Sequence, residues 1–171
     1  QYAQGDGSIL GGFDRRMEEV LQRISHPVFQ SVLTNAVGGG KRVRPLLTCL
    51  SCEAAGGSPR DAIDVAVAVE LLHVASLVHD DIMDGSTMRR GRPTVAEAQG
   101  IPVAVLTGDM LLASAFRLVQ HSSSPRSGEI GRVLIGAFVD LCEGQAYDLL
   151  VVSNERRDRE RHSYTVEQKT A

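Results

Sequence analysis

The chain has 171 residues, enough for one domain around a single hydrophobic core. Its formal net charge of −3 at pH 7 gives no general attraction for nucleic acid, so we expect no nucleic-acid partner. Residues 1–12 are polar and glycine-rich, unlike a secretory signal, and no apolar run looks long enough to cross a bilayer. We therefore expect no transmembrane segment and a cytoplasmic location.

Glycine and proline divide the rest of the chain into helices, because both residues interrupt or end helical segments. In chain order, we expect helices over residues 13–36 with a break near Pro27, then 45–55, 59–84, 95–99, 103–121 and 129–150, and a final helix after residue 161. Residues 154–161 are expected to form a charged connection. Since no stretch alternates apolar and polar residues with a period of two, the sequence predicts an all-α protein.

Three cysteines form no disulfide framework in a chain without an export signal. Cys49 and Cys52 are spaced as CxxC, but they lie within a predicted helix and have no second ligand pair nearby. We therefore expect them to pack in the helix rather than to bind zinc or perform redox chemistry.

Three carboxylates lie at the end of a long apolar helix. On a helix, Asp80, Asp81 and Asp84 fall within an arc of about 100°. Acids are disfavoured at a helix C-terminus, and like charges this close repel one another. A divalent cation such as Mg²⁺, shared with a phosphate, would stabilise the cluster, so the pattern favours a metal site over a solvated acidic turn.

Basic residues occur in two blocks that suit the same anion. Lys41, Arg42 and Arg44 follow Gly38–Gly40 at a helix start, where backbone N–H groups and three cations would form a diphosphate cradle. A basic surface loop is the alternative. Arg89 and Arg90 follow the acidic cluster by a few residues.

Four blocks together resemble, in order, the motifs of trans-isoprenyl diphosphate synthases (polyprenyl synthases, including geranylgeranyl diphosphate synthase-like proteins). They are GGKRxRP at residues 39–45, DDxxD followed by RRGRPT at 80–94, GQxxD at 144–148 and K-T-A at 169–171. The resemblance implies an isoprenoid synthase fold, an antiparallel helix bundle around a central cavity. It also implies Mg²⁺ as cofactor, a homodimer, and condensation of isopentenyl diphosphate with an allylic diphosphate.

The resemblance assigns roles to individual residues. Asp80 and Asp84 would bind Mg²⁺ with the support of Asp81. Isopentenyl diphosphate would be held by Lys41, Arg44, His73 and Arg90. Arg89, Lys169 and Thr170 would contact the allylic diphosphate, with Gln145 in a supporting role near Asp148. Asp109 is expected to be structural, and His79 to pack or form hydrogen bonds.

Product length is suggested by the helix face one turn before the cluster. Relatives with short products carry bulky aromatic residues there, whereas this chain has Ala75 and Ser76, with Leu72 as a deeper partial stop. We therefore expect products of twenty carbons or longer.

Other functions remain open on the sequence alone. A class I terpene cyclase also uses DDxxD but needs no isopentenyl diphosphate site, and an HD-type phosphohydrolase fits the neighbouring acids and arginines poorly. Because members of the resembled family are longer, with a second aspartate-rich motif that would lie beyond Ala171, we expect residues 1–171 to form one all-α domain, the N-terminal half of a longer one. The alternative is a half-length, non-catalytic subunit that completes or regulates a full synthase.

Overall fold

The computed structural model describes residues 8–24, 26–122 and 124–167, with the backbone alone for Val28 and for residues 152–167. The elements in chain order are α1 (Ile9–Gln22), α2 (Pro27–Val37), α3 (Val43–Ala54), the 3₁₀ turn η1 (Pro59–Ala62), α4 (Ile63–Met83), β1 (Met88–Arg89), β2 (Arg92–Pro93), α5 (Val95–Gln99), α6 (Ile101–Gln120) and α7 (Ser127–Glu167). The protein is all-α, as predicted.

The chain divides into two compact units, Gln1–Gly131 and Arg132–Ala171. The first unit holds all elements from α1 to α6, and most of α7 makes up the second. The single domain expected from the sequence stays a prediction.

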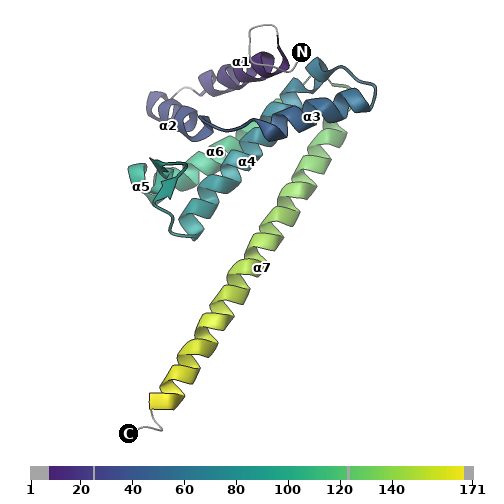
Figure 1. The fold of residues 1–171 in the computed structure, drawn as a ribbon. Coiled ribbons are helices and arrows are strands. Elements are labelled where there is room, and N and C mark those ends of the chain that lie inside the picture. The colour runs from purple at the N-terminus through teal and green to yellow at the C-terminus, as the bar shows by residue number, and fades with distance from the viewer. Residues whose placement is uncertain (1–7, 25, 123, 168–171) are drawn as a thin grey trace. The chain divides into compact units, whose positions relative to one another are not determined.

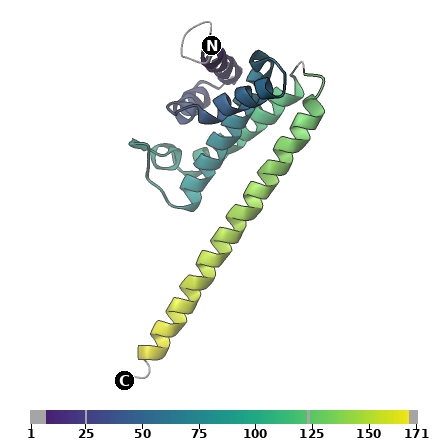
Figure 2. The same cartoon turned by 45° about the vertical axis from the view of Figure 1, so that its right-hand side comes forward.

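The centre of the first unit is the pair α4 and α6, which pack along their lengths (Figure 1). Figure 2 shows the same two helices side by side from a second direction. Both helices bury small and aliphatic side chains completely: Ala66, Val67, Ala68, Leu71 and Ala75 on α4, and Ala104, Leu111 and Ala115 on α6. Small residues allow the two backbones to approach closely, and α4 carries His73 and Asp80 of the candidate site and ends at Asp84.

The first two helices of the chain, α1 and α2, pack on the α4–α6 pair as a second layer. The Ser8 hydroxyl accepts a hydrogen bond from the Gly11 N–H at 3.0 Å, and this cap starts α1 at Ile9, earlier than predicted. Helical spacing then places Phe13, Met17 and Leu21 on one buried face.

Two sequence expectations about local structure are wrong. Residues 154–161 continue α7 rather than connecting two helices. The segment contains neither glycine nor proline, and high charge alone does not end a helix. The short β1–β2 hairpin was also not predicted, because ladders this short leave no alternating pattern.

The segments Pro59–Met83 and Ile101–Gln120 are long and apolar enough to cross a membrane by length and composition. The expectation that no apolar run reaches this length is therefore wrong. This is weak support for a membrane span, because core helices of soluble proteins meet the same criterion, and these two helices pack against each other.

Candidate functional site

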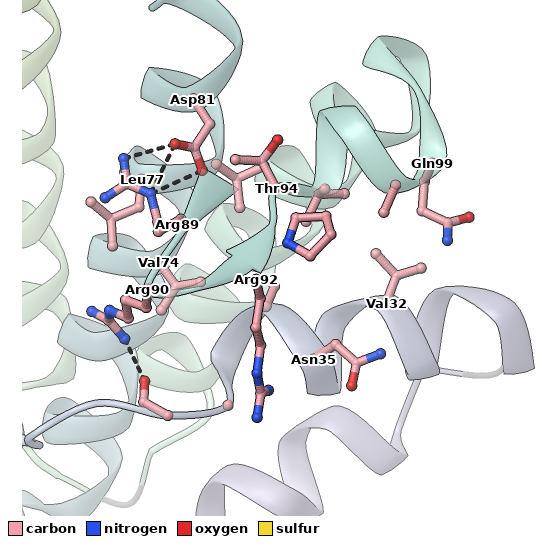
Figure 3. Close-up of a pocket in the computed structure, with 17 residues that line it drawn as sticks. Val32, Asn35, Val74, Leu77, Asp81, Arg89, Arg90, Arg92, Thr94 and Gln99 are labelled. Carbon is pink, nitrogen blue, oxygen red and sulfur yellow. Dashed lines mark hydrogen bonds and ion pairs between the residues drawn. The ribbon is translucent and has the colours of Figure 1, made fainter. Parts of the chain in front are cut away.

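Of the three acidic residues at the end of α4, Asp81 is the one that pairs with an arginine. Asp81 is buried at 5% exposure and faces Arg89, whose Nε lies 2.9 Å from both carboxylate oxygens and whose Nη2 lies 2.8 Å from Oδ1 (Figure 3). This contact raises the pKa of Arg89 above its ordinary value. Asp81 therefore orients Arg89, and its predicted supporting role at the metal stays a prediction.

Asp80 and Asp84 remain as the acidic pair. Burial raises the pKa of Asp80, and the nearby charge of Asp84 raises it further, while Arg89 opposes the shift. No group of three His, Cys, Asp or Glu side chains already arranged to hold a metal ion occurs within the described part of the chain, although the charge of Asp81 also raises the pKa of Asp80. The mutual repulsion of Asp80 and Asp84 fits a divalent cation shared between them, and metal binding stays a prediction.

The arginines that follow are presented by the β1–β2 hairpin. Its two central residues, Arg90 (φ 51°) and Gly91 (φ 76°), both have left-handed backbone conformations, as a type I′ turn requires. The Thr94 hydroxyl fixes the base of the hairpin, donating to the Ser86 carbonyl at 2.9 Å and accepting from the first turn of α5. This acceptor contact confirms the predicted helix cap at Thr94, although the part Thr94 plays in the hairpin was missed.

The hairpin tip meets the glycine-rich loop before α3. Arg90 donates a hydrogen bond to the Gly39 carbonyl (Figure 3), and a Cβ added at Gly40 would lie 3.2 Å from Arg90 Nη1. The structure thus brings together two basic blocks that are about fifty residues apart in the sequence, which is the expected layout of an anion site.

The basic residues of that loop divide into two groups. Lys41 and Arg44 are exposed. Arg42 instead faces the interior, with Nη1 lying 3.3 Å from the Glu70 carboxylate. The prediction that all three cations form one cradle is therefore wrong for Arg42, because a buried carboxylate competes for it.

His73 lies near Arg44 of α3 and the two hairpin arginines. Burial lowers its pKa most, the charge of Arg44 lowers it further, and Arg90 and Arg89 add to the effect against the opposing charge of Glu70. These effects favour the neutral form of the imidazole, and the arginines involved come from α3 and the hairpin. Arg44, Arg90 and Arg89 lie near enough for their charges to act on His73, and the roles predicted for these residues stay predictions.

A cavity of about 530 Å³ opens beside these residues, between α2, α4, α5 and the hairpin (Figure 3). Its walls are apolar, including Val32, Val74 and Leu77, and Arg90 and Arg92 line it as well. The residues predicted to set product length lie elsewhere. Ala75 has no solvent exposure, and the Ser76 hydroxyl donates to the His73 carbonyl at 2.9 Å.

Leu72, Ala75 and Ser76 do not line this cavity, and their effect on product length stays a prediction. Gln145 and Asp148 lie on α7, in the second unit. Lys169 and Thr170 lie outside the described residues.

Two expectations about structural residues are confirmed. His79 packs against α6, with Nε2 3.3 Å from the Val105 carbonyl and 3.6 Å from the Asp109 carboxylate. Cys49 is buried in α3, and the Cys52 thiol donates to the Ser58 carbonyl at 3.3 Å.

Comparison with known proteins identifies the family of the chain. The family model Polyprenyl synthetase matches residues 26–171. The chain belongs to the polyprenyl synthetase family. A short chain isoprenyl diphosphate synthase of Methanothermobacter thermautotrophicus is 41% identical over 138 residues, which is 80% of this chain and 42% of the relative. A geranylgeranyl pyrophosphate synthase of Geoglobus acetivorans is 41% identical over 85% of this chain and 46% of the relative.

Solved structures of the family share the fold. The geranylgeranyl pyrophosphate synthetase of Pyrococcus horikoshii superposes with a TM-score of 0.78 at 41% identity, covering 82% of this chain and 44% of that one. The chain spans about half the length of the curated relatives it matches. The isoprenoid synthase helical fold is thus confirmed.

Proposed function

We propose that the full-length protein is a Mg²⁺-dependent trans-isoprenyl diphosphate synthase that joins isopentenyl diphosphate head to tail with an allylic diphosphate. The observation that carries this proposal is that the hairpin joins the glycine-rich loop to the end of α4: Arg90 donates to the Gly39 carbonyl, and Arg89 pairs with Asp81, which lies between Asp80 and Asp84 in the sequence. The two groups supply cations for diphosphates and carboxylates for a metal. Two relatives whose names describe isoprenyl diphosphate and geranylgeranyl pyrophosphate synthases support the same activity.

Each basic residue of the candidate site binds one of the two substrates in this proposal. Lys41, Arg44, Arg90 and neutral His73 hold the diphosphate of isopentenyl diphosphate, and the imidazole contributes a hydrogen bond rather than a charge. Arg89, oriented by Asp81, contacts the allylic diphosphate, together with Lys169 and Thr170, and Gln145 supports the site. Holding both substrates close converts their encounter into a reaction within one complex.

Asp80 and Asp84 would hold Mg²⁺, which when bound neutralises the developing charge of a leaving diphosphate. In the reaction the allylic C–O bond breaks and its electron pair leaves with the diphosphate. The double bond of isopentenyl diphosphate attacks the resulting cation, and loss of a proton completes a product one isoprene unit longer. Terpene cyclases need no isopentenyl diphosphate site, so the Arg44–His73–Arg90 group favours the condensation.

We further propose products of twenty carbons or longer, because Leu72, Ala75 and Ser76 include no aromatic residue. A homodimer and a cytoplasmic location complete the proposal.

The test is an assay of the purified full-length protein with labelled isopentenyl diphosphate and dimethylallyl, geranyl or farnesyl diphosphate, with Mg²⁺ or with EDTA. We expect Mg²⁺-dependent elongation, and its loss in Asp80→Asn and in Asp84→Asn. The matched control is Asp61→Asn, an exposed acid near the opposite end of α4, which should leave turnover unchanged.

Absence of any elongation product with all three primers would refute the synthase function and favour a non-catalytic partner. Full turnover in the variant carrying both Asp80→Asn and Asp84→Asn would refute the metal assignment alone.

A further inference from the structure

One buried acid has no place in the proposed reaction. Glu70 lies on α4, one turn before His73, with 5% of its surface exposed. Its Oε1 lies 3.3 Å from Arg42 Nη1. A carboxylate removed from water is costly unless it is paired, so the pair constrains both partners.

Arg42 is held from several directions. Its Nη1 also donates to the Val37 carbonyl at 3.2 Å, its Nε lies 3.5 Å from the Asp14 carboxylate, and its guanidinium stacks 5.3 Å from the centre of the Phe13 ring. Contacts from α1, α2 and α4 thus converge on one side chain in the loop before α3.

The backbone of Arg42 is unusual for this residue type. It adopts the left-handed conformation (φ 50°, ψ 33°) at the N-cap of α3, although it has a Cβ and makes no side-chain cap. Residues other than glycine, asparagine and aspartate rarely adopt this conformation unless the surroundings enforce it. The inward contacts of the Arg42 side chain supply that enforcement.

The inward orientation of Arg42 affects the basic residues near it in the sequence. Lys41 and Arg44 flank it and are exposed, and Arg44 is close enough to His73 for its charge to act there. The same loop touches the hairpin, since a Cβ added at Gly40 would lie 3.2 Å from Arg90 Nη1 and 3.9 Å from Glu70 Oε1. Glu70 therefore lies beneath the point where the loop and the hairpin meet.

We infer that Glu70 is a positioning residue, which holds Arg42 inward so that Lys41 and Arg44 present their charges to the diphosphate of the non-allylic substrate. This role rests on the proposed function for the identity of the substrate. The exposed charges of Lys41 and Arg44 by themselves indicate an anionic ligand.

The test compares Glu70→Gln with wild type in steady-state kinetics and in calorimetric titration with inorganic pyrophosphate. Glutamine keeps the shape and removes the charge that holds Arg42. We expect the KM for isopentenyl diphosphate and the Kd for pyrophosphate to rise about tenfold, because supporting residues of a site carry effects of this size. The KM for the allylic diphosphate should stay within about twofold, since no contact of Glu70 reaches the Asp81–Arg89 pair.

The matched control is Asp64→Asn. Asp64 also lies on α4 and also pairs with an arginine, since its Oδ1 lies 2.7 Å from Arg16 Nε, but it is near the start of the helix. Its loss should lower stability without changing the KM for isopentenyl diphosphate, which separates positioning from a general loss of packing. If Glu70→Gln does not fold, Arg42→Lys takes its place, because lysine keeps the charge but not the planar group with several donors.

The outcomes are distinguishable. An unchanged KM for isopentenyl diphosphate in folded Glu70→Gln, or an equal rise in Asp64→Asn, would overturn the inference and leave the synthase function standing. If wild type is inactive, the pyrophosphate titration decides: weaker binding by Glu70→Gln supports the positioning role, and equal binding or no binding to wild type overturns it.

Discussion

Gly108 in α6 lies against the ring of His79 in α4, and replacing it with alanine tests how closely these two helices pack. An added Cβ would lie 2.2 Å from Nε2, 2.5 Å from Cδ2 and 2.7 Å from Cε1 of His79. Favourable contacts between heavy atoms lie near 3.5–4.0 Å, so the ring or the helix must move by roughly 1 Å.

The expected change in the free energy of unfolding is the sum of two destabilising contributions and one stabilising contribution. Overpacking of this kind costs about 1–3 kcal/mol. Loss of the His79 contact to the Val105 carbonyl, at 3.3 Å, adds about 0.5–1.5 kcal/mol. Better helix propensity of alanine returns about 1 kcal/mol. We therefore expect Gly108→Ala to lower the free energy of unfolding by about 0.5–3.5 kcal/mol, measured by urea denaturation followed by circular dichroism.

A double-mutant cycle identifies the cause. In a His79→Ala background the space is open, and Gly108→Ala should be neutral or stabilising by up to about 1 kcal/mol. Gly128→Ala in the first turn of α7, where no atom lies within 4 Å of the added Cβ, is the control and should not destabilise. Equal destabilisation by Gly108→Ala with and without His79 would refute the proposed clash.

Three further predictions concern the candidate site. Arg42→Met leaves Glu70 buried without its charged partner and should cost about 3–5 kcal/mol of unfolding free energy, and a loss below about 1 kcal/mol would show that the carboxylate finds another partner. The pKa of His73 is lowered from 6.5 in the folded state, so on acidification the unfolded chain binds the proton first. Stability should thus fall as pH drops from 6.5 towards the lower folded pKa, and His73→Gln should flatten this part of a pH series of urea midpoints, which an unchanged slope would contradict. Thr94→Val removes the cap of α5 and the bond to the Ser86 carbonyl and should cost about 1–2 kcal/mol in the same measurement, whereas Thr94→Ser should retain most of the stability.

Much of the fold was predictable because helix ends depend on local chemistry. Pro27, Pro59 and Thr94 mark helix starts, and the glycines after α2, α3 and α5 mark helix ends, close to where the structure has them. These residues act through their own backbone preferences or through a cap a few residues away, so no distant contact is needed. The charged segment at 154–161 was mistaken because charge reports solvent exposure and does not break a helix.

The sequence predicts which residues form the candidate site, but it does not predict how their side chains are oriented. Asp80, Asp84, Arg44, His73 and Arg90 are predicted to form one anion and metal site because they occupy motif positions of one family. Only the tertiary structure decided that Asp81 pairs with Arg89 and that Arg42 faces Glu70. A charged side chain can reach either the site or the interior from the same backbone position, and the partner buried nearby decides between them. The partner lies outside the local sequence: Asp81 and Arg89 are eight residues apart, and Arg42 and Glu70 are 28 apart. Local sequence patterns therefore do not predict which way these side chains face.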